Sequence, residues 1–141
     1  MKPWIKIAIA VVFFITLTVI GVGLYLFNKQ HSDLQNVNPD YVITAVDLQK
    51  AFEDDETSAI AKYVNRVIEV SGIIESVKAG EKNVLNITLK TGSDLSSVIC
   101  TFPPATSSMN LLSGNYVVIR GECSGFLMDV LLNNCTLVRQ D

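Results

Sequence analysis

The sequence lacks every short motif that commonly marks an enzyme active site. It contains no serine nucleophile elbow, phosphate-binding loop, dinucleotide-binding fingerprint or paired-carboxylate pattern. Histidine occurs once, as His31, in a polar segment where a lone imidazole is expected to be solvated rather than catalytic. These absences predict a protein that is not an enzyme and that has no catalytic residue and no cofactor.

Clustered positive charge is also missing. Without Lys2 and Lys6, which precede a long apolar run, the chain has 9 basic and 14 acidic residues and a net charge of −5. Phosphate backbones and anionic lipid headgroups both require concentrated Lys or Arg. Nucleic acid is therefore not an expected partner, and the charge suits a solubilised domain held near a membrane surface.

Cysteine is scarce, and its spacing does not fit a metal site. Cys100, Cys123 and Cys135 could supply three ligands without any Cys-x-x-Cys pair, whereas structural zinc takes four ligands, so no metal is predicted. No basic residue lies beside them in sequence to activate a thiol. Two interpretations remain open: all three pack in the core, or Cys100 forms one disulfide with Cys123 or Cys135 in an oxidising compartment.

The remaining cysteine pairing is excluded by strand geometry. A straight hairpin that turns near Gly125 to Leu127 places Cys123 opposite residue 129 or 130. Cys135 then lies roughly 16 to 20 Å further along the strand, beyond the reach of a disulfide. A Cys123–Cys135 bridge is therefore not expected.

One long apolar run lies near the N-terminus. Its 21 residues, from Ile7 to Phe27, include no charge, and a helix of this length spans roughly 30 Å of hydrocarbon. The run ends without the small residues of a cleavage site, which favours an uncleaved anchor over a secretory signal. Lys2 and Lys6 precede the run and Lys29 follows it, which favours a cytoplasmic N-terminus. We predict a single-pass membrane protein whose C-terminal domain is extracytoplasmic, in the periplasm.

The segment after the apolar run predicts a tether. From Asn28 to Asp40 the chain reads NKQHSDLQNVNPD, which is polar and has no helical periodicity. The predicted organisation is an anchor over residues 1–27, a flexible tether over residues 28–40 and one folded domain over residues 41–141.

Helical periodicity returns only between Thr44 and Asn65. Thr44 begins a variant capping box, and the first helix is expected to end near Glu53. Asp54 or Asp55 then caps a second helix, whose predicted buried face is Ala59, Ile60 and Tyr63. The adjacent carboxylates lack the alternation and the glycine of a calcium-binding loop, so they are assigned to capping and solvated surface.

From Arg66 onward, β-branched and apolar runs are separated by turn residues, which predicts a small antiparallel sheet or barrel. The expected strands are Arg66–Lys78, Val84–Lys90, Ser97–Phe102, Tyr116–Ser124 and Met128–Val138. Ser71-Gly72, within the long first strand, predicts a bulge or bend that lets one strand serve two sheets. The fold class is therefore mainly β: a five-stranded OB-fold barrel preceded by a short helical pair, with an N-terminal transmembrane helix.

Three segments of the domain resemble a known family. AVDLQKAFEDDETSAIAKYVNRVIEVSGII, VICTF and GECSGFLMDVLLNNCTL occur in this order within Tyr41–Val138. Their order and spacing resemble the tRNA_anti-like family of membrane-anchored or secreted OB-fold domains. The resemblance implies the fold, and it implies neither an enzyme activity nor a ligand.

These observations together predict a membrane-tethered, non-catalytic binding module that contacts a protein, peptide or glycan. Phe102 is the only aromatic residue on the second and third predicted strands, so the surface for base stacking is poor. Phe102, Glu122 and Asp129 are the candidate ligand or turn contacts, and Asp129 is also suited to bonding backbone amides at a turn. An oligonucleotide-binding protein and a structural subunit of an envelope complex are the alternatives.

Overall fold

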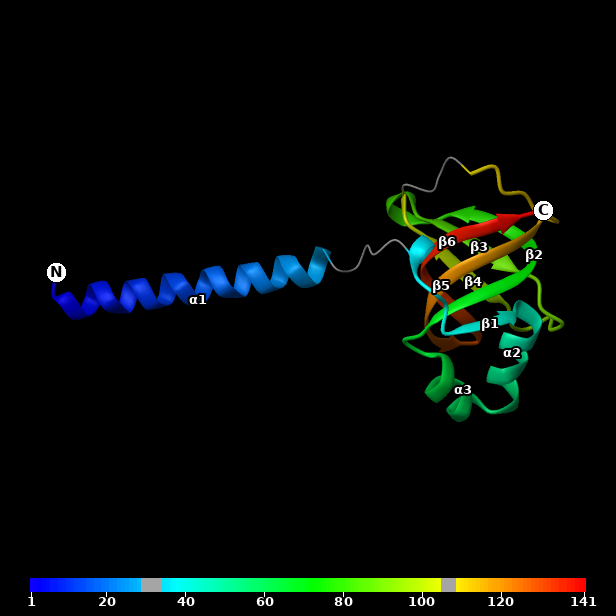
Figure 1. Ribbon diagram of the computed structural model, residues 1–141, viewed down its shortest axis with the longest axis horizontal. Helices are drawn as coiled ribbons and strands as arrows, with labels where there is room; N and C mark the ends of the chain where they lie inside the picture. The colour runs from blue at the N-terminus through cyan, green and yellow to red at the C-terminus, as the bar shows by residue number, and fades with distance from the viewer. Residues whose placement is uncertain (29–33, 105–108) are drawn as a thin grey trace. The chain divides into compact units, whose positions relative to one another are not determined.

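The computed structural model describes residues 1–28, 34–104 and 109–141. The chain divides into two compact units, Met1–Ser32 and Asp33–Asp141. The first unit contains the helix α1 (Pro3–Asn28), and the second contains six strands with short helices in the part of the chain that is described (Figure 1).

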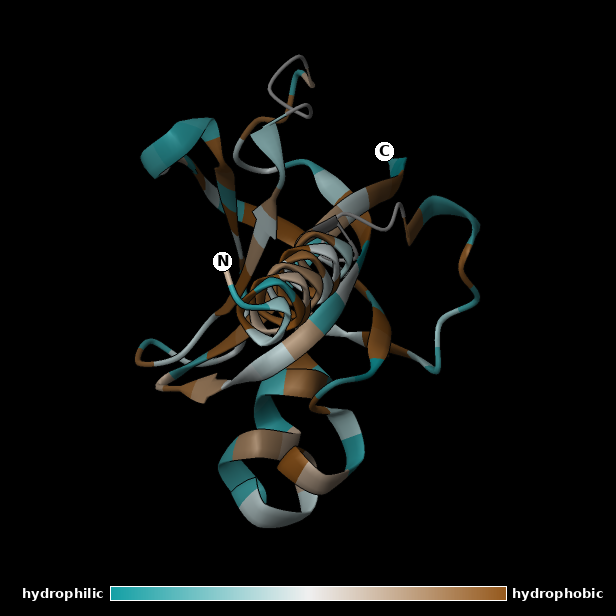
Figure 2. Ribbon diagram, turned by 90° about the vertical axis from the view of Figure 1, so that its left-hand side faces the viewer, coloured by the Kyte–Doolittle hydropathy of each residue, from teal (hydrophilic) through white to brown (hydrophobic). Residues whose placement is uncertain are grey.

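Helix α1 is predominantly apolar, and Lys6 near its start is its one charged residue. The most apolar window of 18 residues within Pro3–Phe27 has a mean hydropathy of 2.7 and is not buried, and Figure 2 shows the brown colour of hydrophobic residues in the helix. Its two threonine hydroxyls donate to main-chain carbonyls four residues earlier, Thr16 to Val12 at 2.5 Å and Thr18 to Phe14 at 2.6 Å. No other helix in the described ranges is long and apolar enough to cross a membrane.

The second unit is built on a closed five-stranded barrel. Its strands are β2 (Val67–Ala79), β3 (Leu85–Leu89), β4 (Val98–Phe102), β5 (Tyr116–Leu127) and β6 (Asp129–Gln140). They are hydrogen-bonded in the order β2-β3-β4-β6-β5, and pairing of β5 with β2 closes the barrel. Among these five strands, only the β4–β6 pair is parallel. The predicted mainly β fold and its five barrel strands are confirmed.

Within the barrel the long strand β2 pairs with two other strands of one continuous sheet, whereas the sequence predicts a strand that serves two sheets. Its first half pairs with β5 and its second half with β3. The register shift lies between Ile74 and Ser76, not at Ser71-Gly72. Gly72 instead permits close packing, because a Cβ at this position would lie 3.1 Å from the Cβ of Ala45. The position of the predicted bulge is therefore corrected by about three residues.

A sixth strand was not expected from the sequence. β1 (Tyr41–Thr44) pairs in parallel with β2 at the edge of the sheet. It has only four residues, and its last residue, Thr44, is also the N-cap of the following helix. Such a short run next to a helix signal gives no period-2 pattern that could be recognised in the sequence.

The predicted helical pair is present, and local hydrogen bonds define where each helix begins. α2 (Ala45–Asp54) starts at Thr44, whose hydroxyl oxygen accepts from the Asp47 amide at 3.1 Å. α3 (Glu56–Tyr63) starts at Asp55, whose carboxylate accepts from the Ser58 hydroxyl at 2.7 Å and the Ser58 amide at 3.1 Å. These bonds, led by the hydroxyl of Ser58, lower the pKa of Asp55.

The helical pair packs against one end of the barrel (Figure 1). Phe52 of α2 is buried, and its ring stacks on Phe126 of β5 with the centroids 5.3 Å apart. Tyr63 of α3 lies 6.1 Å from the Phe52 ring. The predicted buried face of α3 is correct for Ala59 and Tyr63 but wrong for Ile60, which is 41% exposed because its side of the short helix faces solvent.

Candidate ligand face

Strands β2, β3, β4 and β6 present a continuous surface on the outside of the barrel, here called the outer face. Its members alternate along the strands with fully buried residues such as Ile87 and Cys100, as the pleat requires. Cross-strand register places them in two rows. The outer face consists of Ser76, Lys78, Asn86, Thr88, Ile99, Thr101 and Leu131.

The chemistry of the outer face is mostly polar and uncharged. Hydroxyl and amide side chains form its centre, where the Thr101 hydroxyl donates to the Asn86 Oδ1 at 2.9 Å. Ile99 and Leu131 form an adjacent aliphatic strip, and Lys78 is the one cation of the set. Such a surface can exchange hydrogen bonds with amides or hydroxyls and can cover a small apolar group. It offers no ring on which a base could stack.

Phe102 does not lie on the outer face. Its side chain is 0% exposed, and it belongs to the core cluster of the barrel together with Val98 and Cys100 of the same strand. The expectation that Phe102 contacts a ligand is therefore corrected: strict alternation along β4 points residue 102 inward with residues 98 and 100.

Glu122 and Asp129 occupy different environments. Glu122 is exposed on β5, opposite Val67 of β2 and Asn133 of β6. Asp129 lies at the start of β6, where its Oδ1 accepts from the Ser97 amide at 2.7 Å and the Ser97 hydroxyl at 2.8 Å. Asp129 thus holds the β3–β4 loop beside the β5–β6 turn, and this part of its predicted role is structural.

The two acidic residues form a matched pair for a stability test. Asp129→Ala is expected to lower the free energy of unfolding by about 1 to 3 kcal/mol, because the partly buried amide and hydroxyl of Ser97 both lose their acceptor. Glu122→Ala is expected to change it by less than about 0.5 kcal/mol. Urea unfolding of the full-length variants in detergent measures both values, and equal effects would contradict the assigned structural role of Asp129.

All three cysteines are buried in the barrel as free thiols. The Cys135 thiol donates to the Leu132 carbonyl at 3.4 Å and also lies within hydrogen-bonding reach of Cys100. Burial raises the pKa of Cys123 and raises that of Cys135 well above its ordinary value, so both stay protonated and poorly nucleophilic. A disulfide in an oxidising compartment stays a prediction, and Cys135 is the partner that lies beside Cys100.

The hairpin register differs from the straight hairpin expected. Leu127 pairs with Asp129 and Cys123 pairs with Leu132, because β5 continues to Leu127 and the chain turns at Met128, whose φ is 67°. Register shifts interrupt the pairing at three places along the two strands. The β5–β6 hairpin is therefore bent rather than straight.

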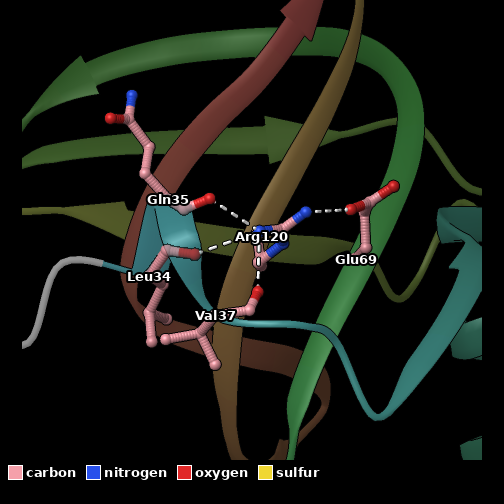
Figure 3. A network of polar contacts seen from close by, with 5 residues as sticks. All are labelled: Leu34, Gln35, Val37, Glu69 and Arg120. Carbon is pink, nitrogen blue, oxygen red and sulfur yellow. Dashed lines mark hydrogen bonds and ion pairs between the residues drawn. The ribbon is translucent and has the colours of Figure 1, made fainter.

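A polar network that the sequence did not reveal fixes the segment before β1 (Figure 3). We call Leu34–Asp40 the strap. Its first three residues form the short 3-10 helix η2 (Leu34–Asn36), and Leu34 is only 5% exposed. Three main-chain carbonyls of the strap lie within hydrogen-bond distance of Nη1 of Arg120 on β5: those of Leu34 at 3.1 Å, Gln35 at 3.0 Å and Val37 at 2.7 Å.

The strap corrects the expectation of a flexible tether over residues 28–40. The second half of the predicted tether, from Leu34 to Asp40, is attached to the barrel. In addition to the bonds with Arg120, the Asp40 amide donates to the Val67 carbonyl at 2.8 Å. Residues 29–33, including His31, lie outside the described residues. Leu34, one of two aliphatic residues in the polar segment, is the sequence signal that could have indicated the attachment.

A small cavity of about 270 Å³ lies where β1 meets the bend of β2. Val46, Ile73 and Tyr116 contribute most of the large apolar groups of its lining, and Lys90 is its charged residue. Within the ranges that the structure describes, no group of histidine, cysteine or acidic side chains could hold a metal ion.

The closed barrel with its long, shared strand is of the OB-fold class. The model of the tRNA_anti-like family matches residues 1–137, and the chain belongs to this family. The fold is similar to the crystal structure of a "putative nucleic acid-binding lipoprotein" from Klebsiella pneumoniae subsp. pneumoniae. The TM-score is 0.58, with 17% identity over 69% of this chain and 91% of that chain, so the likeness supports the fold alone. No match was found among curated proteins.

Proposed function

We propose that the protein is a membrane-tethered, non-catalytic binding module in the periplasm, and that its outer face binds a protein, peptide or glycan. The observation that carries the proposal is the composition of the outer face, which combines hydroxyl and amide groups with an aliphatic strip. Main-chain amides of a peptide and hydroxyls of a glycan are the groups that such side chains bind. The apolar helix α1 supports the membrane attachment, and the lysines at its N-terminal side support the orientation.

Nucleic acid is the second candidate, because the similar structure from Klebsiella is described as nucleic acid-binding. The comparison gives no support to the expectation that nucleic acid is not a partner. The outer face argues against it, since only Lys78 could neutralise a phosphate there and no aromatic ring is presented. The third candidate, a structural subunit of an envelope complex, shares the membrane attachment and would bind its partner constitutively.

One pair of experiments separates these candidates. Full-length protein in nanodiscs is titrated with a fluorescent single-stranded oligonucleotide at several salt concentrations. The protein is also crosslinked in its own membranes, purified and analysed for bound proteins and glycans. We expect no oligonucleotide binding beyond a weak, non-specific level at 150 mM salt, and one consistent envelope partner.

A substitution in the outer face is the control for the capture experiment. Thr88→Arg places a bulky cation at the centre of the outer face and is expected to reduce partner recovery at least about tenfold. Glu53→Arg, on the exposed side of α2, is expected to leave recovery unchanged. Tight oligonucleotide binding that weakens steeply with salt, or recovery that is insensitive to Thr88→Arg, would count against the proposal.

A further inference from the structure

We propose that Arg120 is a positioning residue: by holding the strap on the barrel wall, it sets how far the domain can stand from its membrane anchor. The inference rests on the membrane attachment in the proposed function, and it does not depend on which ligand the outer face binds. It begins from the convergence of main-chain oxygens on one guanidinium group.

Arg120 contacts the main chain of the strap through hydrogen bonds, not its side chains. Three carbonyls approach its Nη1 within 2.7 to 3.1 Å, from residues that are more than 80 positions away in sequence. Carbonyls around a cation form charge-assisted hydrogen bonds, which are stronger than bonds between neutral groups. A guanidinium can make these bonds with one terminal nitrogen while its other terminal nitrogen binds a second partner. A lysine side chain has a single ammonium nitrogen and cannot bind two separate groups in this planar arrangement.

The second partner of Arg120 is Glu69 on the neighbouring strand. The two residues are direct cross-strand partners, and Nη2 of Arg120 lies 2.7 Å from the Glu69 carboxylate (Figure 3). The Arg120 and Glu69 side chains are only 13% and 19% exposed. The ion pair therefore fixes the guanidinium on the barrel wall in the orientation that presents Nη1 to the strap.

The strap has attachments at both ends. At its start, the side chain of Leu34 is buried against the barrel, where η2 packs on β5 and β6. At its end, Asp40 exchanges hydrogen bonds with Val67: its amide donates to the Val67 carbonyl at 2.8 Å, and its Oδ2 accepts from the Val67 amide at 3.0 Å. The bonds of Asp40 do not involve Arg120, so loss of Arg120 frees only the first part of the strap.

The consequence is a change in the reach of the domain. Helix α1 ends at Asn28 and the strap begins at Leu34, so the connecting chain spans at most about 20 Å, whatever its conformation. If the strap were held only at Asp40, the connecting chain could span about 40 Å. Arg120, together with the buried side chain of Leu34, thereby halves the maximal distance between anchor and barrel and restricts the module to partners presented near the bilayer.

Amide hydrogen exchange on the full-length protein in zwitterionic nanodiscs tests whether Arg120 holds the strap on the barrel. Val37 is a suitable reporter, because its amide donates to the Leu34 carbonyl at 3.2 Å within the strap. Arg120→Lys keeps the charge beside Glu69 but not the fork, and Leu34→Ser releases the strap without changing the ion pair. Both variants are expected to exchange at least about tenfold faster over residues 34–39, with β5 and β6 as protected as in the wild type.

The matched control is Arg139→Lys. Arg139 also forms an ion pair, with Asp141 at 3.2 Å, but both side chains are largely exposed, so the strap should exchange as in the wild type. Unchanged strap exchange in Arg120→Lys with an intact barrel would overturn the role of Arg120, even if Leu34→Ser accelerated exchange.

Energy transfer to labelled lipid tests the reach. A donor dye on Glu53→Cys, at an exposed position of α2, is expected to move about 5 Å further from the bilayer on average when Arg120→Lys is added. Faster strap exchange without a change in this distance would overturn the reach part of the proposal. Absence of transfer in every variant would contradict the membrane anchor of the proposed function. The exchange data would still decide whether Arg120 holds the strap on the barrel.

Discussion

Phe52→Ala is expected to lower the free energy of unfolding by about 3 to 5 kcal/mol, the largest effect of any single substitution considered for this protein. Phe52 is buried between the end of the barrel and α3, with its ring stacked on Phe126 at 5.3 Å and tilted toward Tyr63 at 6.1 Å. Truncation removes the transfer free energy of the ring and leaves a cavity that the helical pair cannot close.

Urea unfolding monitored by far-ultraviolet circular dichroism measures this loss. Val46→Ala is the control, because Val46 lies on the same helix but is 47% exposed, and it should cost less than about 0.5 kcal/mol. A Phe52→Ala protein within 1 kcal/mol of the wild type would mean that α2 is not packed on the barrel as described.

Gly121→Ala is expected to cost about 2 to 3 kcal/mol, although it adds only one methyl group. The new Cβ would lie 2.6 Å from the Cys135 sulfur and 3.3 Å from the Asn133 carbonyl oxygen, so buried atoms on β6 would have to move. Cys135→Ala removes the closest of these atoms. The double variant is therefore expected to recover at least about 1 kcal/mol relative to the sum of the single changes.

Gly92→Ala is the control for the added methyl group, since no atom lies within 4 Å of the position that its Cβ would take. It is expected to be neutral within about 0.5 kcal/mol. If Gly121→Ala were equally neutral, or if the two changes at residues 121 and 135 were simply additive, the close contact between β5 and the Cys135 thiol would be disproved.

The barrel could be predicted because each strand shows a local alternation of buried and more exposed residues in the sequence. Val98, Cys100 and Phe102 alternate with half-exposed residues, and all three are fully buried in β4. The helical pair was equally readable, since each N-cap bonds an amide only three residues ahead. In both cases the deciding interaction lies within a few residues of the signal.

The strap could not be predicted, because its partner is remote. Arg120 is 86 positions from Leu34, and nothing in the polar segment before Asp40 indicates which strand it contacts. The same reason hid the bonds between Asp129 and Ser97, which are 32 positions apart. Long-range side-chain contacts of this kind carry no periodicity and require the closed barrel to bring them together.

The candidate site was predicted only in part. The sequence shows one aromatic residue on the strands that became β3 and β4, Phe102, and predicts it as a candidate ligand contact, but the pleat buries its side chain. The polar outer face was missed because its members are one or two residues on each of four strands. Their proximity follows from the register of β2 with β3, β3 with β4 and β4 with β6, and the local sequence pattern does not supply that register.

The measurement that tests the central claim most directly is position-specific photo-crosslinking in the native membrane. A photoreactive residue replaces Thr88 at the centre of the outer face, or Glu53 on α2 as the control position. We predict that one consistent protein, peptide or glycan is captured from Thr88 and not from Glu53. Capture of nucleic acid at Thr88, or of the same species from both positions, would contradict a binding module that acts through the outer face.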